Sequence, residues 1–431
     1  MRLSLTLFVA CIAGVSAITP NPAVGKWVDS WVSMPQLTEP ANLPPAPFNT
    51  TGLVFPNTTL RQTLRMTLSS SQLRIRISNA FSPTDLTITA ASIALPPNNT
   101  AGSDLIIPNT LQKLTFSGLS SITIPGGALA VSDPINFLVK PTDMVSVSLF
   151  LENGQTGNSI TSHPGSRTTT WMTFGDHHEA TTFTDPSTTS VAHWYFLSAV
   201  ESWSPPNTRA MAIVGDSITD GRGSTTDGND RWTDDLLTRV LGQSTRSRGA
   251  IALLNQAAGG NRILDDGLGP NAVSRIDRDV LSQSGVSYVM IFEGVNDIGT
   301  AAATNSSQQA VGDRLIQAFQ QIITRVHAVG LPIFGATITP FSGDPTIQPY
   351  SDPIREAQRQ RINNWIRTSG KFDGVVDFDA AIRDPSNPAQ LAPQFDSGDF
   401  LHPNPAGYRK LAAQFDLGLF DRFANGVSGF E

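Results

Sequence analysis

The 431-residue sequence predicts a parallel α/β sheet flanked by helices in its second half, preceded by a β-sandwich or jelly roll in its first half. Two observations lead to this prediction. Apolar residues of the first half alternate with polar ones, which is typical of antiparallel strands with one buried face. In the second half, short continuous apolar runs alternate with segments of helical spacing, which indicates strands that are covered by helices on both faces.

The alternation in the first half lasts until about Pro206. Clusters of Gly, Pro, Asn and Ser separate the alternating runs, and no long amphipathic helix interrupts them. We therefore expect residues 18–206 to form a β-rich domain whose strands have one face in solvent. The clearest alternating runs are 64–68, 73–77, 86–90 and 145–151.

The second half, residues 207–431, is expected to form the α/β domain, and residues 204–207 are the expected linker. In such a sheet, ligands bind beyond the carboxyl ends of the strands, so we expect the chemistry directly after the apolar runs. The predicted strands are 210–214, 251–254, 286–292, 331–338 and 375–378, and the predicted helices are 310–329, 355–367 and 406–419.

The amino terminus, residues 1–17, is predicted to be a secretory signal peptide. Arg2 precedes a short apolar stretch that ends in small residues, and this stretch is too short to span a bilayer comfortably. The only cysteine, Cys11, lies in it, so neither a disulfide framework nor a multi-cysteine metal site is expected. We expect a secreted, extracellular protein with four candidate N-glycan sites: Asn49, Asn57, Asn98 and Asn305.

The composition excludes several classes of protein. With 39% hydrophobic and 15% charged residues, the chain is not disordered overall. Its formal net charge of -7 gives no basic footprint for nucleic acid or anionic lipid. No apolar stretch after the signal peptide is long enough for a membrane span. The sequence also predicts no cofactor and no metal site.

A serine and a histidine with an acidic neighbour follow the predicted strands. Ser217 lies in a glycine-containing turn after the first strand of the α/β half, where it is either a nucleophile or only a helix N-cap. Asp399 and His402 are three residues apart before the last helix, so the carboxylate can hold one ring nitrogen while the other faces the serine. We expect the five other histidines to have no such partner and no place at the sheet edge: His163, His177, His178, His193 and His327.

Two further turns offer hydrogen-bond donors to an anion. Gly259 and Gly260 follow the second strand, where a glycine lets the backbone approach a ligand or simply forms a turn. Asn296 follows the third strand, where its amide can donate to an oxyanion or form an Asx-turn.

In this order, the residues resemble the SGNH hydrolases, also called the GDSL esterase/lipase superfamily. The four motifs of that family are GDS at 215–217, N-x-A-x-x-G at 255–260, G-x-N-D at 294–297 and D-x-x-H at 399–402. The resemblance covers about residues 207–420 and implies a five-stranded flavodoxin-like sheet. It also implies a triad of Ser217, Asp399 and His402, and an oxyanion hole made by Ser217, Gly260 and Asn296.

Finer details resemble the xylanase-E-like esterase branch, whose members tend to carry a β-rich amino-terminal domain. Examples are the stretch from Asn229 to Trp232 (NDRW) and SGDFLHPNPAGY at 397–408. This branch suggests removal of short acyl groups, notably acetyl, from carbohydrate or other small esters by an acyl-enzyme route. Together with the signal peptide, it leads us to expect a fungal source.

Three other functions remain open at this stage. They are a lipase or aryl esterase of broader acyl specificity, a non-catalytic carbohydrate-binding protein on a hydrolase scaffold, and a serine peptidase. Trp232 is a candidate platform for sugar stacking, although most tryptophans are core residues. The β-rich domain could bind carbohydrate, shape the mouth of the active site or protect the catalytic domain. The sequence predicts no oligomeric state.

Overall fold

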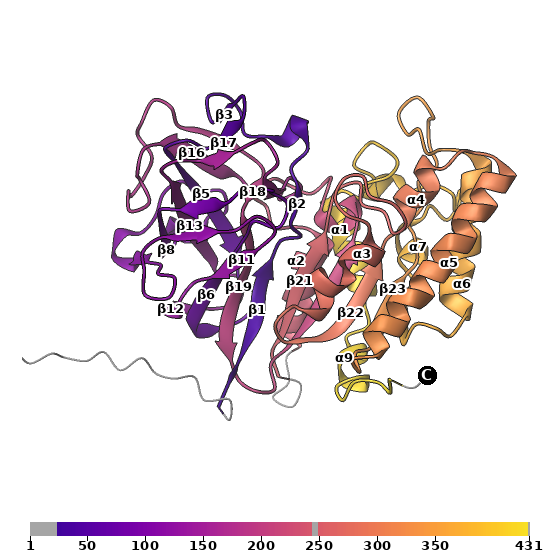
Figure 1. Cartoon of the computed structure of the whole chain (residues 1–431). Helices are drawn as coiled ribbons and strands as arrows, with labels where there is room; N and C mark the ends of the chain where they lie inside the picture. Colours follow the sequence, from indigo (N-terminus) through magenta and orange to yellow (C-terminus); the bar gives the residue numbers. More distant parts are fainter. Residues whose placement is uncertain (1–23, 244–248, 430–431) are drawn as a thin grey trace, which may run out of the picture.

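The computed structural model describes residues 24–243 and 249–429, so the predicted signal peptide with Cys11 lies outside the described residues. Two parts of different architecture lie side by side (Figure 1). The β-rich part runs from β1 (Lys26–Val32) to β19 (Leu197–Ser204), and the α/β part runs from β20 (Arg209–Gly215) to α9 (Gly418–Arg422). Within the described ranges, no helix has the length and apolar character needed to cross a membrane.

The β-rich part is built on two antiparallel sheets. In the first, the strand order is β1, β19, β6 (Ser70–Ser78) and β11 (Leu129–Val131), with β12 (Ile135–Val139) also paired to β6. The second sheet has the order β17 (Thr189–Val191), β16 (Thr170–Phe174), β5 (Thr58–Arg65), β13 (Met144–Leu151), β8 (Ala90–Ala94) and β9 (Gln112–Lys113).

The apolar faces of these sheets meet in one core, which confirms the predicted β-sandwich architecture. Leu73, Ile75 and Ile77 of β6 share a buried cluster with Val145 and Val147 of β13. These residues alternate along both strands, as the period of two requires for one inward face.

The prediction that the other face is solvated is wrong for the central strands β5 and β13. Ser146 and Ser148 of β13 are buried on that face, and so is Arg61 of β5. The Arg61 guanidinium donates to the Ser148 hydroxyl (2.9 Å) and to the Ala180 carbonyl (2.7 Å). The loop that contains residue 180 therefore covers the polar face, and its carbonyls satisfy the buried cation.

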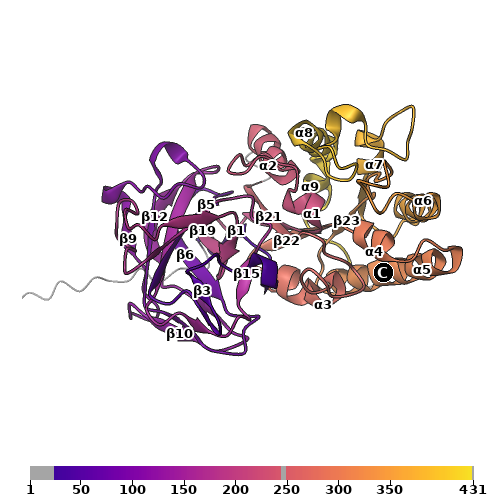
Figure 2. The same ribbon diagram turned by 90° about the horizontal axis from the view of Figure 1, so that it is seen from above.

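The α/β part contains a five-stranded parallel sheet, as predicted. Its order is β21 (Ile251–Ala257), β20, β22 (Val286–Phe292), β23 (Ile333–Ala336) and β24 (Gly374–Val376). This is the flavodoxin-like order, in which the direction of winding reverses at the first strand, so a ligand site is expected beyond the end of β20. Helices α3 (Ala272–Ile276) and α5 (Asn305–His327) lie on one side of the sheet, and α2 (Trp232–Gly242) and α8 (Pro405–Gln414) on the other (Figure 2).

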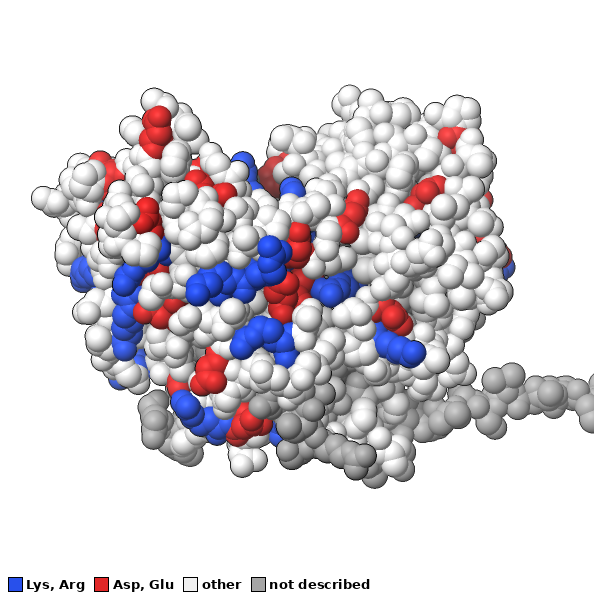
Figure 3. All heavy atoms as spheres, turned by 180° about the vertical axis from the view of Figure 1, so that it is seen from behind, with Lys and Arg blue, Asp and Glu red and all other residues white. Residues whose placement is uncertain are grey.

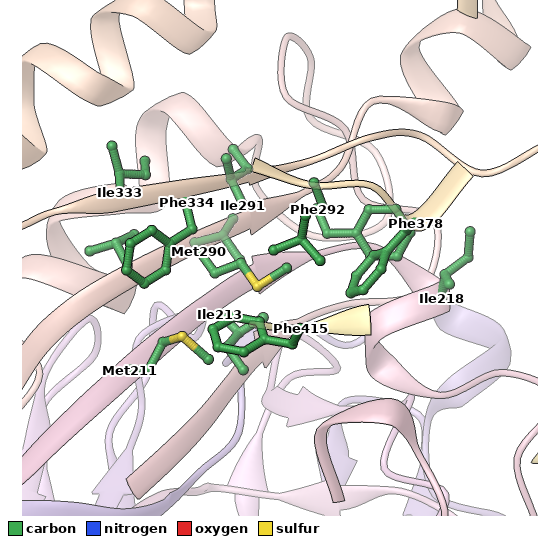
Figure 4. Close-up of a cluster of buried hydrophobic side chains, with 14 of the residues drawn as sticks. Met211, Ile213, Ile218, Met290, Ile291, Phe292, Ile333, Phe334, Phe378 and Phe415 are labelled. Carbon is green, nitrogen blue, oxygen red and sulfur yellow. The ribbon is translucent and has the colours of Figure 1, made fainter. Parts of the chain in front are cut away.

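The core of this part anchors the segment that carries Ser217. Met211 and Ile213 of β20 pack with Met290 of β22 in one buried cluster (Figure 4). Ile218 of the short helix α1 (Ser217–Asp220) and Phe378 of α7 (Phe378–Ile382) belong to the same cluster. Burial of Ile218 therefore fixes α1 directly after β20.

Helices α5 and α6 (Pro353–Thr368) correspond to the helices predicted at 310–329 and 355–367. The helix predicted at 406–419 is too long. Helix α8 ends at Gln414, because Phe415 adopts extended backbone angles (φ −67°, ψ 123°). The Asp416 carboxylate then accepts the Gly418 N–H (2.9 Å) at the start of α9. Asp is a good partner for free N–H groups at a helix start, so the chain begins a new helix there.

The two parts share an apolar interface along β1 and β21. Their contact also includes a pair of hydrogen bonds between Asp29 and Ser284: the Asp29 N–H donates to the Ser284 carbonyl (2.9 Å), and the Ser284 N–H donates to the Asp29 carboxylate (2.8 Å). The buried apolar cluster that joins the parts contains Val28, Val32, Leu68, Ala199, Ala210, Ala252 and Leu254. On the face of the molecule drawn in Figure 3, positive and negative side chains are intermixed.

Candidate active site

Ser217 lies at the first position of α1, directly beyond the carboxyl end of β20. The Asp216 side chain caps this helix by accepting the Ile218 N–H (2.9 Å). Gly221 ends it with φ +109°, a left-handed conformation that glycine adopts without strain. This tight strand–helix turn holds Ser217 at the edge of the sheet, where the serine is 6% exposed.

The predicted partners of Ser217 lie next to it. The Ser217 Oγ is 2.8 Å from Nε2 of His402, and Nδ1 of His402 is 2.6 Å from the Asp399 carboxylate. The backbone N–H groups of Leu401 (3.1 Å) and His402 (2.8 Å) donate to the other carboxylate oxygen of Asp399. The loop before α8 therefore presents serine, imidazole and carboxylate as a continuous hydrogen-bonded row.

The electrostatics of Asp399 suit a carboxylate that orients an imidazole. Partial burial opposes its ionisation, but the hydrogen bonds and positive charge of His402 hold the pKa of Asp399 well below its usual range. Asp399 therefore stays ionised over the whole neutral and mildly acidic range.

The glycine pair forms a tight turn beside the serine. The Ala258 N–H donates to the Gly215 carbonyl (3.1 Å), and the Asn261 N–H closes the turn on the Ala258 carbonyl (3.2 Å). Gly260, the third residue of the turn, has φ +71°, and a Cβ there would lie 2.4 Å from the Leu268 side chain. Glycine adopts this left-handed conformation without strain and avoids that contact.

Two backbone N–H groups in this region lack an acceptor among the described residues. Within the described part of the chain, the N–H groups of Ser217 and Gly260 donate no hydrogen bond to the protein. Both were predicted to face an oxyanion, and a backbone N–H that is free in the resting site is what such a role requires.

Asn296, in α4 (Val295–Thr300), is held in one orientation. Its Nδ2 donates to the Asn261 carbonyl (2.9 Å), and its Oδ1 accepts from the Tyr350 hydroxyl (3.2 Å). Since a carbonyl can only accept, the amide nitrogen must face Asn261, which leaves one amide hydrogen for another acceptor. Tyr350 was not predicted, because no motif of the sequence marks it.

A buried arginine beneath the site was also missed. Arg275 of α3 donates to the carbonyls of Gly215 (3.3 Å) and Gln256 (2.6 Å) and to the Asn261 side chain (3.1 Å). It thereby joins the ends of β20 and β21 to the glycine turn. No motif of the sequence marks Arg275 for this role.

The buried carboxyl of Glu293 is predicted to make stability depend on pH. Burial raises the pKa of Glu293 to about 8, and neither of its carboxyl oxygens has a hydrogen-bond partner among the described residues. The folded protein thus holds a proton that the unfolded chain releases near pH 4.5, so stability is fully present below that pH. It falls as pH rises towards 8, by about 1.4 kcal/mol per pH unit for one such group.

We expect the Glu293→Gln variant to lose less stability than the wild type between pH 5 and 8. Urea unfolding at several pH values measures the difference in slope. Parallel curves for the two proteins would contradict the assignment of this proton to Glu293.

The expectation that the other histidines have no carboxylate partner is wrong for three of them. His163 pairs with Asp220 across the junction of the two parts (2.8 Å), and His327 pairs with Asp373 (2.9 Å). The third pair lies within the β-rich part, where His178 contacts Asp176. Asp220 and Asp373 are far in sequence from the histidines that they contact. Asp176 is near His178 in sequence, but their spacing differs from that of the D-x-x-H motif.

Trp232 is not a sugar platform, because its side chain is fully buried. Its ring packs against Phe378, and its Nε1 donates to the Thr219 hydroxyl (3.2 Å). Trp232 therefore supports α1 from within the core. In the described ranges, no cluster of three or more His, Cys, Asp or Glu side chains could hold a metal ion.

Comparison with known proteins finds a family whose model matches most of the α/β part. Residues 211–415 match the family model described as GDSL-like Lipase/Acylhydrolase. The matched region contains the four motifs on which the resemblance to the GDSL/SGNH hydrolases is based, at 215–217, 255–260, 294–297 and 399–402. No curated protein matches the chain in a sequence comparison.

The solved structures to which this chain is similar include two named enzymes. A GDSL-like lipase from Bacteroides thetaiotaomicron is 16% identical, with 50% of this chain and 89% of that chain covered and a TM-score of 0.36. Axe2, an acetylxylan esterase from Geobacillus stearothermophilus, is 20% identical, with 48% of this chain and 92% of that chain covered and a TM-score of 0.35.

Proposed function

We propose that this protein is a serine esterase that removes short acyl groups, notably acetyl, from carbohydrate or other small esters. The observation that carries the proposal is the row of hydrogen bonds from Ser217 Oγ through His402 to Asp399, with heavy-atom distances of 2.8 and 2.6 Å. These distances are in the range that proton transfer between a nucleophile and its base requires.

In the proposed reaction, Ser217 Oγ attacks the ester carbonyl carbon while His402 Nε2 takes the hydroxyl proton. The tetrahedral intermediate then expels the alcohol, which receives that proton from His402, and the acyl group remains on Ser217. Water then attacks the acyl group on Ser217 in the same way, with His402 taking its proton and returning it to Ser217 Oγ, and the carboxylic acid is released. Asp399 keeps Nδ1 protonated throughout and stabilises the imidazolium that forms twice in the cycle.

The negative oxygen of each tetrahedral intermediate is held by three donors. They are the backbone N–H groups of Ser217 and Gly260 and the amide hydrogen of Asn296 that Asn261 does not use. Each such donor, fixed before the reaction begins, contributes on the order of 3 kcal/mol to lowering the barrier.

The protein is further proposed to act outside the cell. The predicted signal peptide at 1–17 and the Asn-x-Ser/Thr sequons support secretion. Asn57, Asn98 and Asn305 are exposed and suited to carry glycans, whereas Asn49 is half-buried and its amide oxygen is fully buried.

A series of substrates tests the acyl specificity. We expect 4-nitrophenyl acetate to be cleaved with a kcat/KM at least about tenfold higher than the octanoate, because each misfitting methylene costs about 1 kcal/mol or more in a small pocket. Acetylated xylan assayed beside these esters, with acetate release as the readout, tests the carbohydrate substrate. A higher kcat/KM for the octanoate would favour the lipase alternative.

A further inference from the structure

A histidine of the β-rich part reaches the helix that carries Ser217. His163 ends β15 (Thr161–His163), is 3% exposed, and stacks on Trp194. Its Nε2 lies 2.8 Å from Oδ1 of Asp220, the last residue of α1, and its Nδ1 lies 3.0 Å from the Met34 carbonyl.

Both ring nitrogens of His163 therefore face acceptors. A carbonyl oxygen and a carboxylate cannot donate, so the ring must supply a proton on each side. Burial opposes the charge, but the Asp220 carboxylate outweighs it, and the pKa of His163 is raised above its ordinary value. The result is a buried imidazolium–carboxylate pair that spans the two parts of the chain.

The β-rich chain approaches α1 very closely at this contact. A Cβ on Gly165 would lie 1.6 Å from Oδ2 of Asp220, so only glycine lets the β-rich chain come so near to α1. The Arg231 guanidinium donates to the Asp220 carbonyl (2.9 Å) and to the Ser166 carbonyl. The end of α1 and the segment after β15 are therefore joined by several buried polar contacts.

Asp220 also holds the glycine turn. Its Oδ2 accepts the Gly259 N–H at 3.0 Å, while its Oδ1 accepts from His163. Gly259 is the second residue of the turn and Gly260 the third, so Asp220 fixes the peptide unit directly before the free Gly260 N–H. At its other end, the turn is held through Asn261 by Asn296 and Arg275.

We propose that the β-rich part is an integral support of the esterase site, in which His163 acts through Asp220 as a positioning residue for the Gly260 N–H. This inference rests on the proposed function and gives the β-rich part a definite role in it. His163 touches no reacting atom. It holds the Asp220 carboxylate in place, and Asp220 holds the glycine turn. The turn in this way points the Gly260 N–H at the oxyanion.

The test compares four variants by steady-state kinetics on 4-nitrophenyl acetate and by thermal unfolding. We expect Asp220→Ala and His163→Gln to lower kcat by about 10-fold to 100-fold with KM nearly unchanged, because the displaced donor acts in the transition state. Asp220→Asn should retain most of kcat, since its amide oxygen can still accept from Gly259 and its amide nitrogen can donate to a neutral His163. His178→Gln, which removes a buried histidine paired with a carboxylate elsewhere in the β-rich part, should match the wild type.

Inhibition by phenylboronic acid gives a second readout. Its adduct with a serine hydroxyl is a tetrahedral anion, so its inhibition constant should rise in Asp220→Ala in proportion to the fall in kcat. A folded Asp220→Ala or His163→Gln with wild-type kcat and boronate affinity would overturn the positioning role, as would equal effects in His178→Gln. If Asp220→Ala does not fold, the kcat values of His163→Gln and Asp220→Asn test the positioning role instead. Ser217→Ala, assayed in parallel, separates the two proposals, because its full activity would refute the esterase site itself.

Discussion

Replacement of Ser217 by alanine is expected to lower kcat for 4-nitrophenyl acetate by about a million-fold, to a rate set by the remaining oxyanion donors and substrate binding. The reason is that the Ser217 Oγ, 2.8 Å away, is the hydrogen-bond partner of His402 Nε2. Without the hydroxyl, no acyl-enzyme forms, so water must attack the ester carbonyl carbon directly.

The matched control for this variant is Ser224→Ala. Ser224 is another buried serine close to α1, and its hydroxyl donates to the Gly221 carbonyl (2.6 Å) rather than facing a base. We expect its kcat to stay within about threefold of the wild type, as for a substitution outside the reacting groups. Equal activity of Ser217→Ala and the wild type would remove Ser217 from the mechanism.

The second large effect is expected for Asp399→Asn, with a fall in kcat of about ten-thousand-fold. An asparagine in this place can offer its amide nitrogen to Nδ1 of His402 and so favour the wrong tautomer, with the proton on Nε2. That proton would prevent Nε2 from accepting the one on Ser217 Oγ. The lost negative charge would also no longer stabilise the imidazolium.

Asp396→Asn, in the same loop, controls for charge and loop structure. The Asp396 carboxylate accepts the N–H groups of Gly398 (3.0 Å) and Phe400 (3.1 Å), which an asparagine oxygen can also do, and it does not touch His402. We expect near wild-type kcat for this variant. A fall in kcat as large as that of Asp399→Asn would mean that the loop, rather than the Asp399–His402 pair, is responsible.

The sequence predicts the α/β sheet and the local parts of the site well, because both depend on short-range patterns. Apolar runs of four to eight residues mark the buried strands. Three of the motifs directly follow such a run, and the D-x-x-H motif precedes the last predicted helix. Since parallel strands end at one edge of the sheet, Ser217, Gly260 and Asn296 were expected to lie together, and the hydrogen bonds through Asn261 and Gly215 join them.

What the sequence could not predict depends on contacts between distant segments. The partner of Asp220, His163, lies in a strand of the other part, and Tyr350 reaches Asn296 from a loop without any motif. The covered polar face of β13 shows the same limitation. Its Ser146 and Ser148 alternate like solvent-facing residues, and only the packing of a later loop over them makes them buried.

The most direct test of the central claim, that Ser217 is a nucleophile activated by His402, is labelling with a fluorophosphonate followed by intact mass and peptide mapping. We expect one adduct per chain, located on Ser217. The adduct should be absent in Ser217→Ala, and it should form much more slowly in Asp399→Asn. An unlabelled wild-type protein, or the same adduct in Ser217→Ala, would contradict the account.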